Sequence, residues 1–246
     1  EDYFEPAIHI RHNDYNSSLL LKYVDHSSNA IDNGVNETVI TLKDDKYPVT
    51  VKLHYVAYGK ENIIRTFTEI SHEEKKPVIL CKYASSMLHL NSSKYFLTEF
   101  SGDWAHEANV TERELAFGKK VIDTKLGARA NMFVSPFFQL ALDNSSQENA
   151  GEVLVGTIGW TGNFRFTFEV DNKNELRIIS GINPYDSEYS LPAREVFRTP
   201  DFYFTYSTQG KGEASRSFHD WARNHQVKNG NDTRMTLLNN WESTYF

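Results

Sequence analysis

Apolar side chains recur at every second position from Pro48 to Tyr58, and a β-strand is the regular structure that gives such residues a common face. The alternating residues are Val49, Val51, Leu53, Tyr55 and Ala57. Successive side chains of a strand point to opposite faces of a sheet, so this period predicts a half-buried strand. Residues 59–62 then form a turn, and residues 63–70 alternate again. The two runs predict an antiparallel meander.

Strand-like runs bounded by Gly, Asn or Asp continue along most of the chain. They cover residues 7–11, 18–25, 38–42, 78–87, 95–100, 137–142, 153–160, 164–170 and 176–182. Residues 12–16 and the glycine-spaced stretch 156–164 are predicted to be hairpin turns. No internal repeat of fixed length occurs, which argues against solenoids and propellers. The predicted fold class is therefore all-β, a large antiparallel sandwich.

One helix is predicted near the end of the chain. Phe218, Trp221, Ala222 and His225 follow the spacing of a single helical face. Ser215 is the predicted N-cap, and the polar stretch 228–232 ends the helix as a loop.

Charge and hydropathy exclude several classes of partner. The net charge of -7 repels phosphate backbones, so no nucleic acid partner is expected. The sequence has no apolar run of 18 or more residues and no basic leader followed by an apolar stretch, so no membrane partner is expected either. Cys81 is the one cysteine, which rules out an intramolecular disulfide and a cysteine metal cluster.

No metal or other cofactor is expected. His106 and Glu107 suggest a zinc protease helix, but that motif needs a second histidine where Val110 stands. His9 and His12 are separated by three positions on a strand and a turn, and are predicted to be polar surface residues.

The last ten residues look like a buried strand that runs into polar and aromatic residues. Leu237 and Leu238 enter it, a pair of asparagines follows, and Trp241 and Glu242 stand at the exit. A parallel barrel strand has this pattern where it reaches a rim that binds a ligand.

This terminal run, with Arg234 before it, closely resembles the opening of the catalytic barrel in glycoside hydrolase family 36, the bacterial α-galactosidases. The family pattern is R-P-x-L-x-N-N-W-E-A-T-Y-F-D, in which Met235 replaces Pro and Ser243 replaces Ala here. Weaker resemblances lie upstream. Residues 2–7 resemble D-Y-R-E-P-A, residues 102–107 resemble G-x-W-x-x-E, and residues 160–164 resemble Y-S-G-N-F.

The resemblance implies a domain organisation. Residues 1–212 would be the β-supersandwich domain of the family with its first strands absent, and residues 213–235 a helical linker. Residues 236–246 would be the first strand of a missing (β/α)8 barrel.

The resemblance also implies a function for the parent protein. It would be a retaining α-galactosidase, a glycosidase that hydrolyses terminal α-linked galactose from galacto-oligosaccharides with two carboxyl groups about 5 Å apart. The family places these groups in K-W-D and G-G-R-x-D settings, and neither occurs here. The nucleophile and the acid/base are therefore expected beyond Phe246, and the fragment is expected to be inactive.

Trp241 and Glu242 are the implied substrate-binding residues, with Trp241 stacking on the galactose ring. An alternative role for Trp241 is packing at the seam between sandwich and barrel, and a regular strand would point the two side chains in opposite directions. The implied partners are a galactoside, the protein's own barrel and further copies in a homo-oligomer. Activity on N-acetylgalactosamine and a location in bacterial cytoplasm or periplasm stay open.

A rival interpretation is a non-catalytic carbohydrate-binding or structural β-sandwich module, which composition alone favours equally. The terminal run discriminates between the two, because a module that folds alone has no reason to carry a barrel-entry strand.

Overall fold

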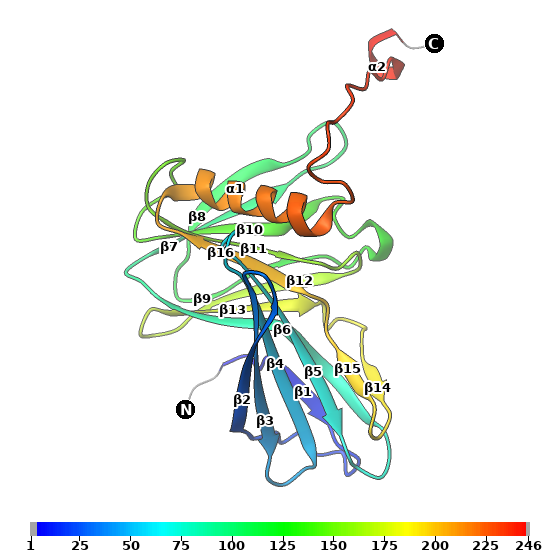
Figure 1. The fold of residues 1–246 in the computed structure, drawn as a ribbon. Coiled ribbons are helices and arrows are strands. Elements are labelled where there is room, and N and C mark those ends of the chain that lie inside the picture. The colour runs from blue at the N-terminus through cyan, green and yellow to red at the C-terminus, as the bar shows by residue number, and fades with distance from the viewer. Residues whose placement is uncertain (1–3, 245–246) are drawn as a thin grey trace.

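The computed structural model describes residues 4–244, apart from the side chains of Glu242 and Ser243, as a sandwich of two antiparallel sheets (Figure 1). Among these residues the smaller sheet has six strands, namely β1 (Ile8–Arg11), β6 (Val78–Asn91), β9 (Gly118–Asp123), β12 (Phe164–Val170), β13 (Glu175–Ile182) and β14 (Tyr189–Leu191). The larger has ten, namely β2 (Leu21–Asp32), β3 (Val35–Asp44), β4 (Val49–Tyr58), β5 (Ile63–His72), β7 (Tyr95–Ser101), β8 (Asn109–Glu114), β10 (Val134–Leu142), β11 (Glu152–Ile158), β15 (Val196–Arg198) and β16 (Phe202–Ser207). The predicted all-β sandwich is confirmed.

The larger sheet runs in the order β2-β3-β4-β5-β16-β11-β10-β7-β8, with β15 beside β5. The smaller runs β1-β6-β13-β12-β9, with β14 beside β6. Strands β2 to β5 are consecutive neighbours, so the predicted meander is confirmed. Its register places Leu53 opposite Thr68.

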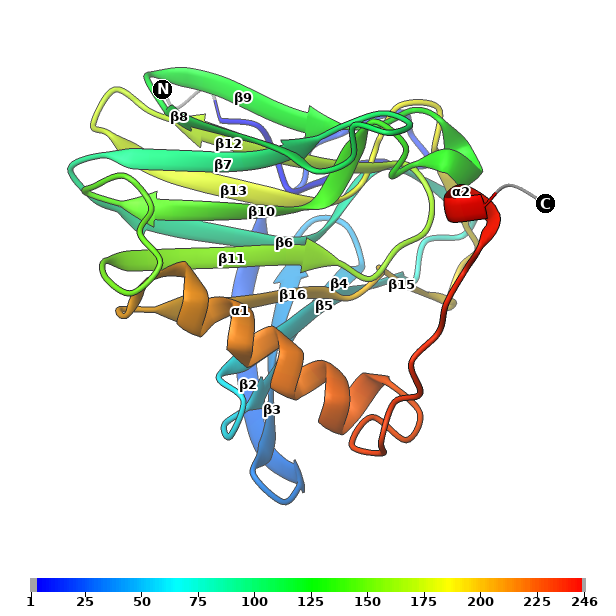
Figure 2. The same cartoon turned by 90° about the horizontal axis from the view of Figure 1, so that it is seen from above.

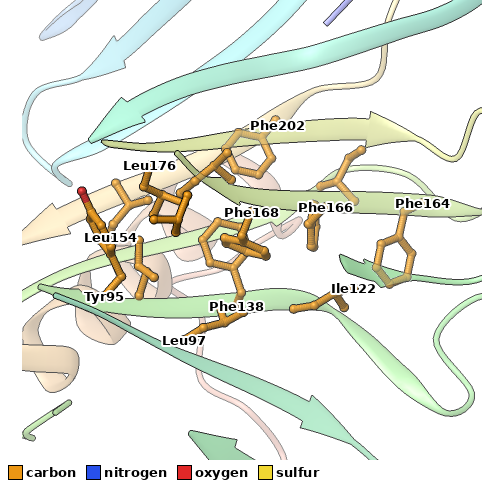
Figure 3. Packing of buried hydrophobic residues seen from close by; sticks show 14 of the residues in the cluster. Tyr95, Leu97, Ile122, Phe138, Leu154, Phe164, Phe166, Phe168, Leu176 and Phe202 are labelled. Atoms are coloured by element: carbon orange, nitrogen blue, oxygen red, sulfur yellow. The ribbon is translucent and has the colours of Figure 1, made fainter. Parts of the chain in front are cut away.

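The main core lies between the two sheets and is rich in phenylalanine (Figure 3). Phe138 of β10 packs edge-on against Phe166 and Phe168 of β12, with ring centroids 5.3 Å and 4.9 Å away. Phe202 of β16 closes the same cluster. Gly156 lies beside these rings. A Cβ at this position would be only 2.6 Å from Cζ of Phe138, so there is no room for a side chain. A glycine within strand β11 therefore marks a close approach of aromatic rings.

Two predicted hairpins are wrong. Strand β1 pairs with β6 and β2 with β3, so residues 12–16 connect different sheets. Strand β11 likewise pairs with β10 and β16, whereas β12 pairs with β13 and β9. The stretch 159–163 therefore crosses from one sheet to the other. Alternation identifies a strand, but it does not identify the neighbour of that strand.

The turn after β1 also buries a residue that was predicted to be exposed. His12 is 3% exposed, and its Nδ1 lies 2.7 Å from Oε1 of Glu74. Its Nε2 lies 3.0 Å from the carbonyl oxygen of Ser18, and its ring stacks on Tyr47 at 3.6 Å. Hydrogen bonds to Glu74, far along the sequence, and to the nearby Ser18 thus compensate the burial of the imidazole. His9 is half-buried.

The helical part comprises the 3-10 turn η1 (Gly127–Arg129), α1 (Gly210–Trp221), the π-helix η2 (Ala222–Gln226) and the single turn α2 (Trp241–Thr244). Figure 2 shows α1 lying along β11 and β16, on the outer face of the larger sheet. Ala214 and Phe218 pack there against Val153 and Val155. None of the helices in residues 4–244 is long and apolar enough to cross a membrane.

Helix α1 begins at Gly210 with Gln209 at the N-cap position, so the predicted N-cap Ser215 lies inside the helix. The backbone N–H groups of Gly210, Lys211 and Gly212 each donate at 2.9 Å to a carbonyl of the loop 147–151. This loop satisfies donors that a capping side chain would otherwise take. Gly210 has a φ of +82°, and a Cβ there would lie 2.6 Å from backbone atoms of the loop. Gly210 and Gly212 thus permit a close-packed helix start.

Candidate functional site

The C-terminal segment that carries the predicted substrate-binding residues leaves the sandwich as an extended chain (Figure 1). Residues 233–240 have no regular secondary structure. Met235, Leu237 and Leu238 are between 84% and 89% exposed, and Trp241 is 59% exposed. The terminal strand predicted for residues 236–246 is therefore absent from the described part of the chain.

A physical reason for this difference is the lack of neighbouring strands. A strand in a parallel barrel is held by ladders to the strands on both of its sides. The contacts of the segment include local hydrogen bonds from the Thr244 backbone N–H and Oγ1 to the carbonyl oxygen of Asn240, both 3.0 Å. One helical turn of this kind has little stability of its own.

Trp241 is the first residue of α2, and its backbone N–H donates to Oδ1 of Asn239 at 3.0 Å. It lines none of the cavities described below. The side chain of Glu242, together with Tyr245 and Phe246, lies outside the described residues. Of the two predicted substrate-binding residues, the structure therefore describes the side chain of Trp241 alone, which is largely exposed at the end of the linker.

The start of this linker is fixed to the sandwich at the end of α1. Trp221 is 7% exposed and packs on Tyr58 and Tyr203, with ring centroids 5.9 Å and 4.6 Å away. The buried carboxylate of Glu61 accepts a hydrogen bond from Asn224 Nδ2 at 2.9 Å and lies 3.3 Å from Nε2 of His225. Both of these partners belong to η2. The π-helix therefore ties the helix end to the turn between β4 and β5.

The phenol of Tyr203 beneath Trp221 is neutral over the physiological range. Burial, with the neighbouring Asp201 carboxylate, raises the pKa of Tyr203 to about 12. Its hydroxyl donates to Oδ2 of Asp201 at 3.1 Å, and Arg198 holds the other carboxylate oxygen at 2.5 Å. This arrangement orients Tyr203 as a packing surface for the helix, not as an acid or base.

An open cleft of about 420 Å³, here called the inter-sheet cleft, separates the sheets near β2 and β6. Its apolar wall includes Leu19, Leu21, Leu42 and Leu53. The opposite wall includes residues 84–87 of β6. Consecutive side chains of a strand point to opposite faces, so these residues can line one cavity together only along an edge of the strand. Strand β1 starts opposite Tyr83, and the last backbone hydrogen bond that the described residues form on this side runs from the Ala84 N–H to the carbonyl oxygen of Ala7 at 2.9 Å, so this edge of β6 continues beyond the start of β1.

Two hydroxyl groups in the lining of the inter-sheet cleft lack partners among the described residues. Thr66 and Ser85 are each 2% exposed. Within residues 4–244 neither Oγ1 of Thr66 nor Oγ of Ser85 has a hydrogen-bond partner. Buried polar atoms are usually satisfied, so the cleft has the character of a core with one side uncovered. No sequence motif connects these two residues, which come from β5 and β6.

The chemically rich stretch 99–107 forms the end of β7 and the turn into β8. Trp104 is 84% exposed, and a Cβ at Gly102 would lie 2.6 Å from the carbonyl oxygen of His106. The glycine therefore permits a compact turn. No group of three His, Cys, Asp or Glu side chains in the described part of the chain is placed to hold a metal ion.

Comparison with known families gives two matches. Residues 1–192 match the model described as "Glycosyl hydrolase family 36 N-terminal domain", and residues 196–246 match the model described as "Melibiase". The second match includes α1, the linker and the C-terminal segment.

Curated relatives have the same affiliation. α-Galactosidase AgaA of Geobacillus stearothermophilus is 30% identical over 233 residues, covering 94% of this chain and 31% of that protein. α-Galactosidase Mel36A of Lactobacillus acidophilus is 26% identical over 261 residues, covering 100% and 35%. α-Galactosidase 2 of Hypocrea jecorina is 29% identical over 214 residues, covering 86% and 28%. The chain thus spans about a third of the length of the curated relatives it matches.

Solved structures have the same fold. A variant of AgaA from Geobacillus stearothermophilus, in complex with stachyose, superposes with a TM-score of 0.91 at 27% identity, covering 100% of this chain and 36% of that one. Another AgaA variant, in complex with raffinose, gives 0.91 at 26% identity with the same coverage. The α-galactosidase of Lactobacillus brevis gives 0.90 at 24% identity, covering 100% and 35%, and supports the fold alone.

Proposed function

Because this chain belongs to glycosyl hydrolase family 36, we propose that it is the N-terminal part of a retaining α-galactosidase that releases terminal α-linked galactose from galacto-oligosaccharides. The observation that carries the proposal is the continuous match from the sandwich through the linker into the Melibiase model. The division follows the resemblance, with a sandwich at 1–212, a helical linker at 213–235 and a first barrel strand at 236–246. The exposure of Leu237 and Leu238 supports a barrel as the partner of this last segment.

The catalytic carboxyl groups of the proposed reaction belong to the rest of the parent protein. A retaining glycosidase needs a nucleophile and an acid/base about 5 Å apart. Neither family motif for these groups occurs in the sequence. Turnover is therefore a property of the full-length protein.

Trp241 is the residue of this chain that we place in the galactose pocket. An indole at the tip of the first barrel strand can stack on the apolar face of a sugar ring, which contributes about 1 to 3 kcal/mol when desolvated. Its 59% exposure leaves it accessible for that contact. Glu242 accompanies it as a second proposed substrate-binding residue on the strength of the resemblance.

The inter-sheet cleft supports a further part of this organisation, namely that additional strands of the domain lie outside the chain. A strand paired with the part of this β6 edge that the described residues leave free would lie end to end with β1. It would also cover Leu19 and Leu42 on the cleft wall. Its backbone and side chains would also lie within reach of the hydroxyl groups of Thr66 and Ser85. Homo-oligomerisation of the full-length protein stays a prediction from the resemblance.

The rival function, a non-catalytic binding or structural module, gains no specific support from the geometry. A module that folds alone has no use for a linker that exposes Met235, Leu237 and Leu238 together.

The test compares the full-length parent with the 246-residue chain on a nitrophenyl α-galactoside, and follows the anomer released by proton NMR. We expect the parent to release α-galactose first, as retention requires, and the chain alone to be inactive. Release of β-galactose first by the parent would refute the retaining mechanism. Turnover by the purified chain would refute the assignment of the carboxylates.

A further inference from the structure

A second cavity, of about 410 Å³, lies on the outer face of the larger sheet between the β7–β8 hairpin and the N-terminal half of α1. We call it the polar groove. Its floor is a row of three side chains from adjacent strands, because Gln139 of β10 pairs with Thr98 of β7 and Thr98 pairs with Glu112 of β8. Lys211 of α1 and the loop residue Glu148 belong to its walls. A cavity of this size is within the range that holds small molecules, about 300 to 1,000 Å³.

The loop side of the polar groove is held in place by Glu112. One carboxylate oxygen of Glu112 accepts hydrogen bonds from the Ser146 backbone N–H at 3.1 Å and from the Thr98 hydroxyl at 3.2 Å. The other oxygen accepts a hydrogen bond from the Ser145 hydroxyl. The loop 145–148 therefore has a defined position without any contribution from a ligand.

Four polar groups line the polar groove without a side-chain partner among the described residues. Among the described residues, the Gln139 amide, the Lys211 ammonium and the Glu148 carboxylate form no side-chain hydrogen bond or ion pair. The hydroxyl of Ser146 is shielded from solvent and also lacks a partner within residues 4–244. Gln139 and Lys211 are half-buried, so solvent reaches them only in part.

An apolar side adjoins the polar row. Phe100 and Val110 pair across β7 and β8 and point to the same face as Thr98 and Glu112, two positions away in each strand. Phe100 also contacts Phe137, with ring centroids 5.3 Å apart. The groove thus combines an aromatic surface with convergent polar groups.

We propose that the polar groove binds a neutral, hydroxyl-rich ligand, namely a saccharide, at a site separate from Trp241. An ammonium only donates, a carboxylate only accepts, and an amide and a hydroxyl do both. Ligand hydroxyl groups can pair with the Gln139 amide, the Lys211 ammonium and the Glu148 carboxylate, whereas an anion would meet Glu112 and Glu148 and a cation would meet Lys211. Phe100 offers the stacking surface that the apolar face of a sugar ring requires. The choice of a saccharide over other polyols rests on the proposed function.

The experiment titrates the ¹⁵N-labelled 246-residue chain with raffinose and follows backbone amide shifts. We expect saturable shifts confined to residues 98–100, 110–112, 139, 146–148 and 211–215. Gln139→Ala and Lys211→Met should each weaken binding about five- to tenfold, through the loss of one or two hydrogen bonds. Lys173→Ala, in the exposed turn between β12 and β13, is the matched control and should leave the affinity unchanged. Trp241→Ala should also leave it unchanged.

The absence of saturable shifts in the folded wild-type chain would overturn the proposal. So would binding that Trp241→Ala abolishes while the groove variants retain it. Lys211→Met keeps the aliphatic stem on the helix surface, so a folded variant remains available if Gln139→Ala disturbs the sheet. Either negative result leaves the proposed hydrolysis intact, because that reaction is measured on the full-length protein.

Discussion

Gly156 offers a sharp test of the core, because an added methyl group there meets two aromatic rings. A Cβ at this position would lie 2.6 Å from Cζ of Phe138 and 2.7 Å from Cζ of Phe202. Both rings are fully buried, so neither can move into solvent. Overpacking of this kind costs about 1 to 3 kcal/mol. Replacing glycine also restricts the unfolded chain, which offsets about 0.4 to 1 kcal/mol of that loss.

Thermal and urea unfolding of Gly156→Ala should therefore show a net destabilisation. In a chain of this length about 2 to 4 °C of melting temperature corresponds to each kcal/mol. Gly59→Ala is the matched control, because its Cβ would be 3.4 Å from the nearest atom, the carbonyl oxygen of Gly34, at an ordinary contact distance. The control should change stability by less than about 1 kcal/mol.

A double-mutant cycle attributes the effect to the Phe138 ring. In a Phe138→Leu background the Cζ atom is gone, so Gly156→Ala should be less damaging than in the wild type. We expect a coupling energy of at least about 0.5 kcal/mol. Additive effects, or a Gly156→Ala protein as stable as wild type, would refute the packing described for this core.

Two further outcomes follow from particular contacts. Burial raises the pKa of the Glu5 carboxyl, but Lys82 and Lys119 outweigh this effect and hold the pKa below its usual value. The stabilisation that Glu5 contributes is therefore present at pH values above its pKa in the unfolded chain, and it disappears as pH falls through its pKa in the folded protein. Glu5→Gln should thus lower the melting temperature at pH 7 more than at pH 3, and an equal change at both would contradict the linkage. Gly210→Ala combines a positive φ with a backbone clash. It should lower stability by more than about 2 kcal/mol in urea unfolding, and a neutral effect would exclude the tight helix start.

Sequence reasoning located most strands because alternation is a local property. It missed β16, whose residues are aromatic on both faces, since Phe202 enters the core and Tyr203 packs under Trp221. It also assigned wrong neighbours to β1 and β11, because strand pairing depends on contacts far apart in the sequence. His12 shows the same limitation, since Glu74 supplies its partner from another turn.

The candidate site was predictable only as a motif. Trp241 and Glu242 follow from a terminal run of residue types, but a strand there requires neighbours that the described residues do not supply. The inter-sheet cleft and the polar groove each combine residues from several separate elements, and no spacing in the sequence connects Thr66 with Ser85 or Gln139 with Lys211. Such sites emerge only when the sheets are assembled.

The central claim, that Trp241 forms a wall of the galactose pocket in the parent protein, is tested most directly by Trp241→Ala in the full-length enzyme. The measurement is kcat/KM per folded molecule, recorded beside the melting temperature. We expect a loss of roughly 10- to 200-fold in kcat/KM with little change in melting temperature. An unchanged kcat/KM with a stability loss of about 3 to 5 kcal/mol would instead place Trp241 at the seam between sandwich and barrel, and would contradict the account.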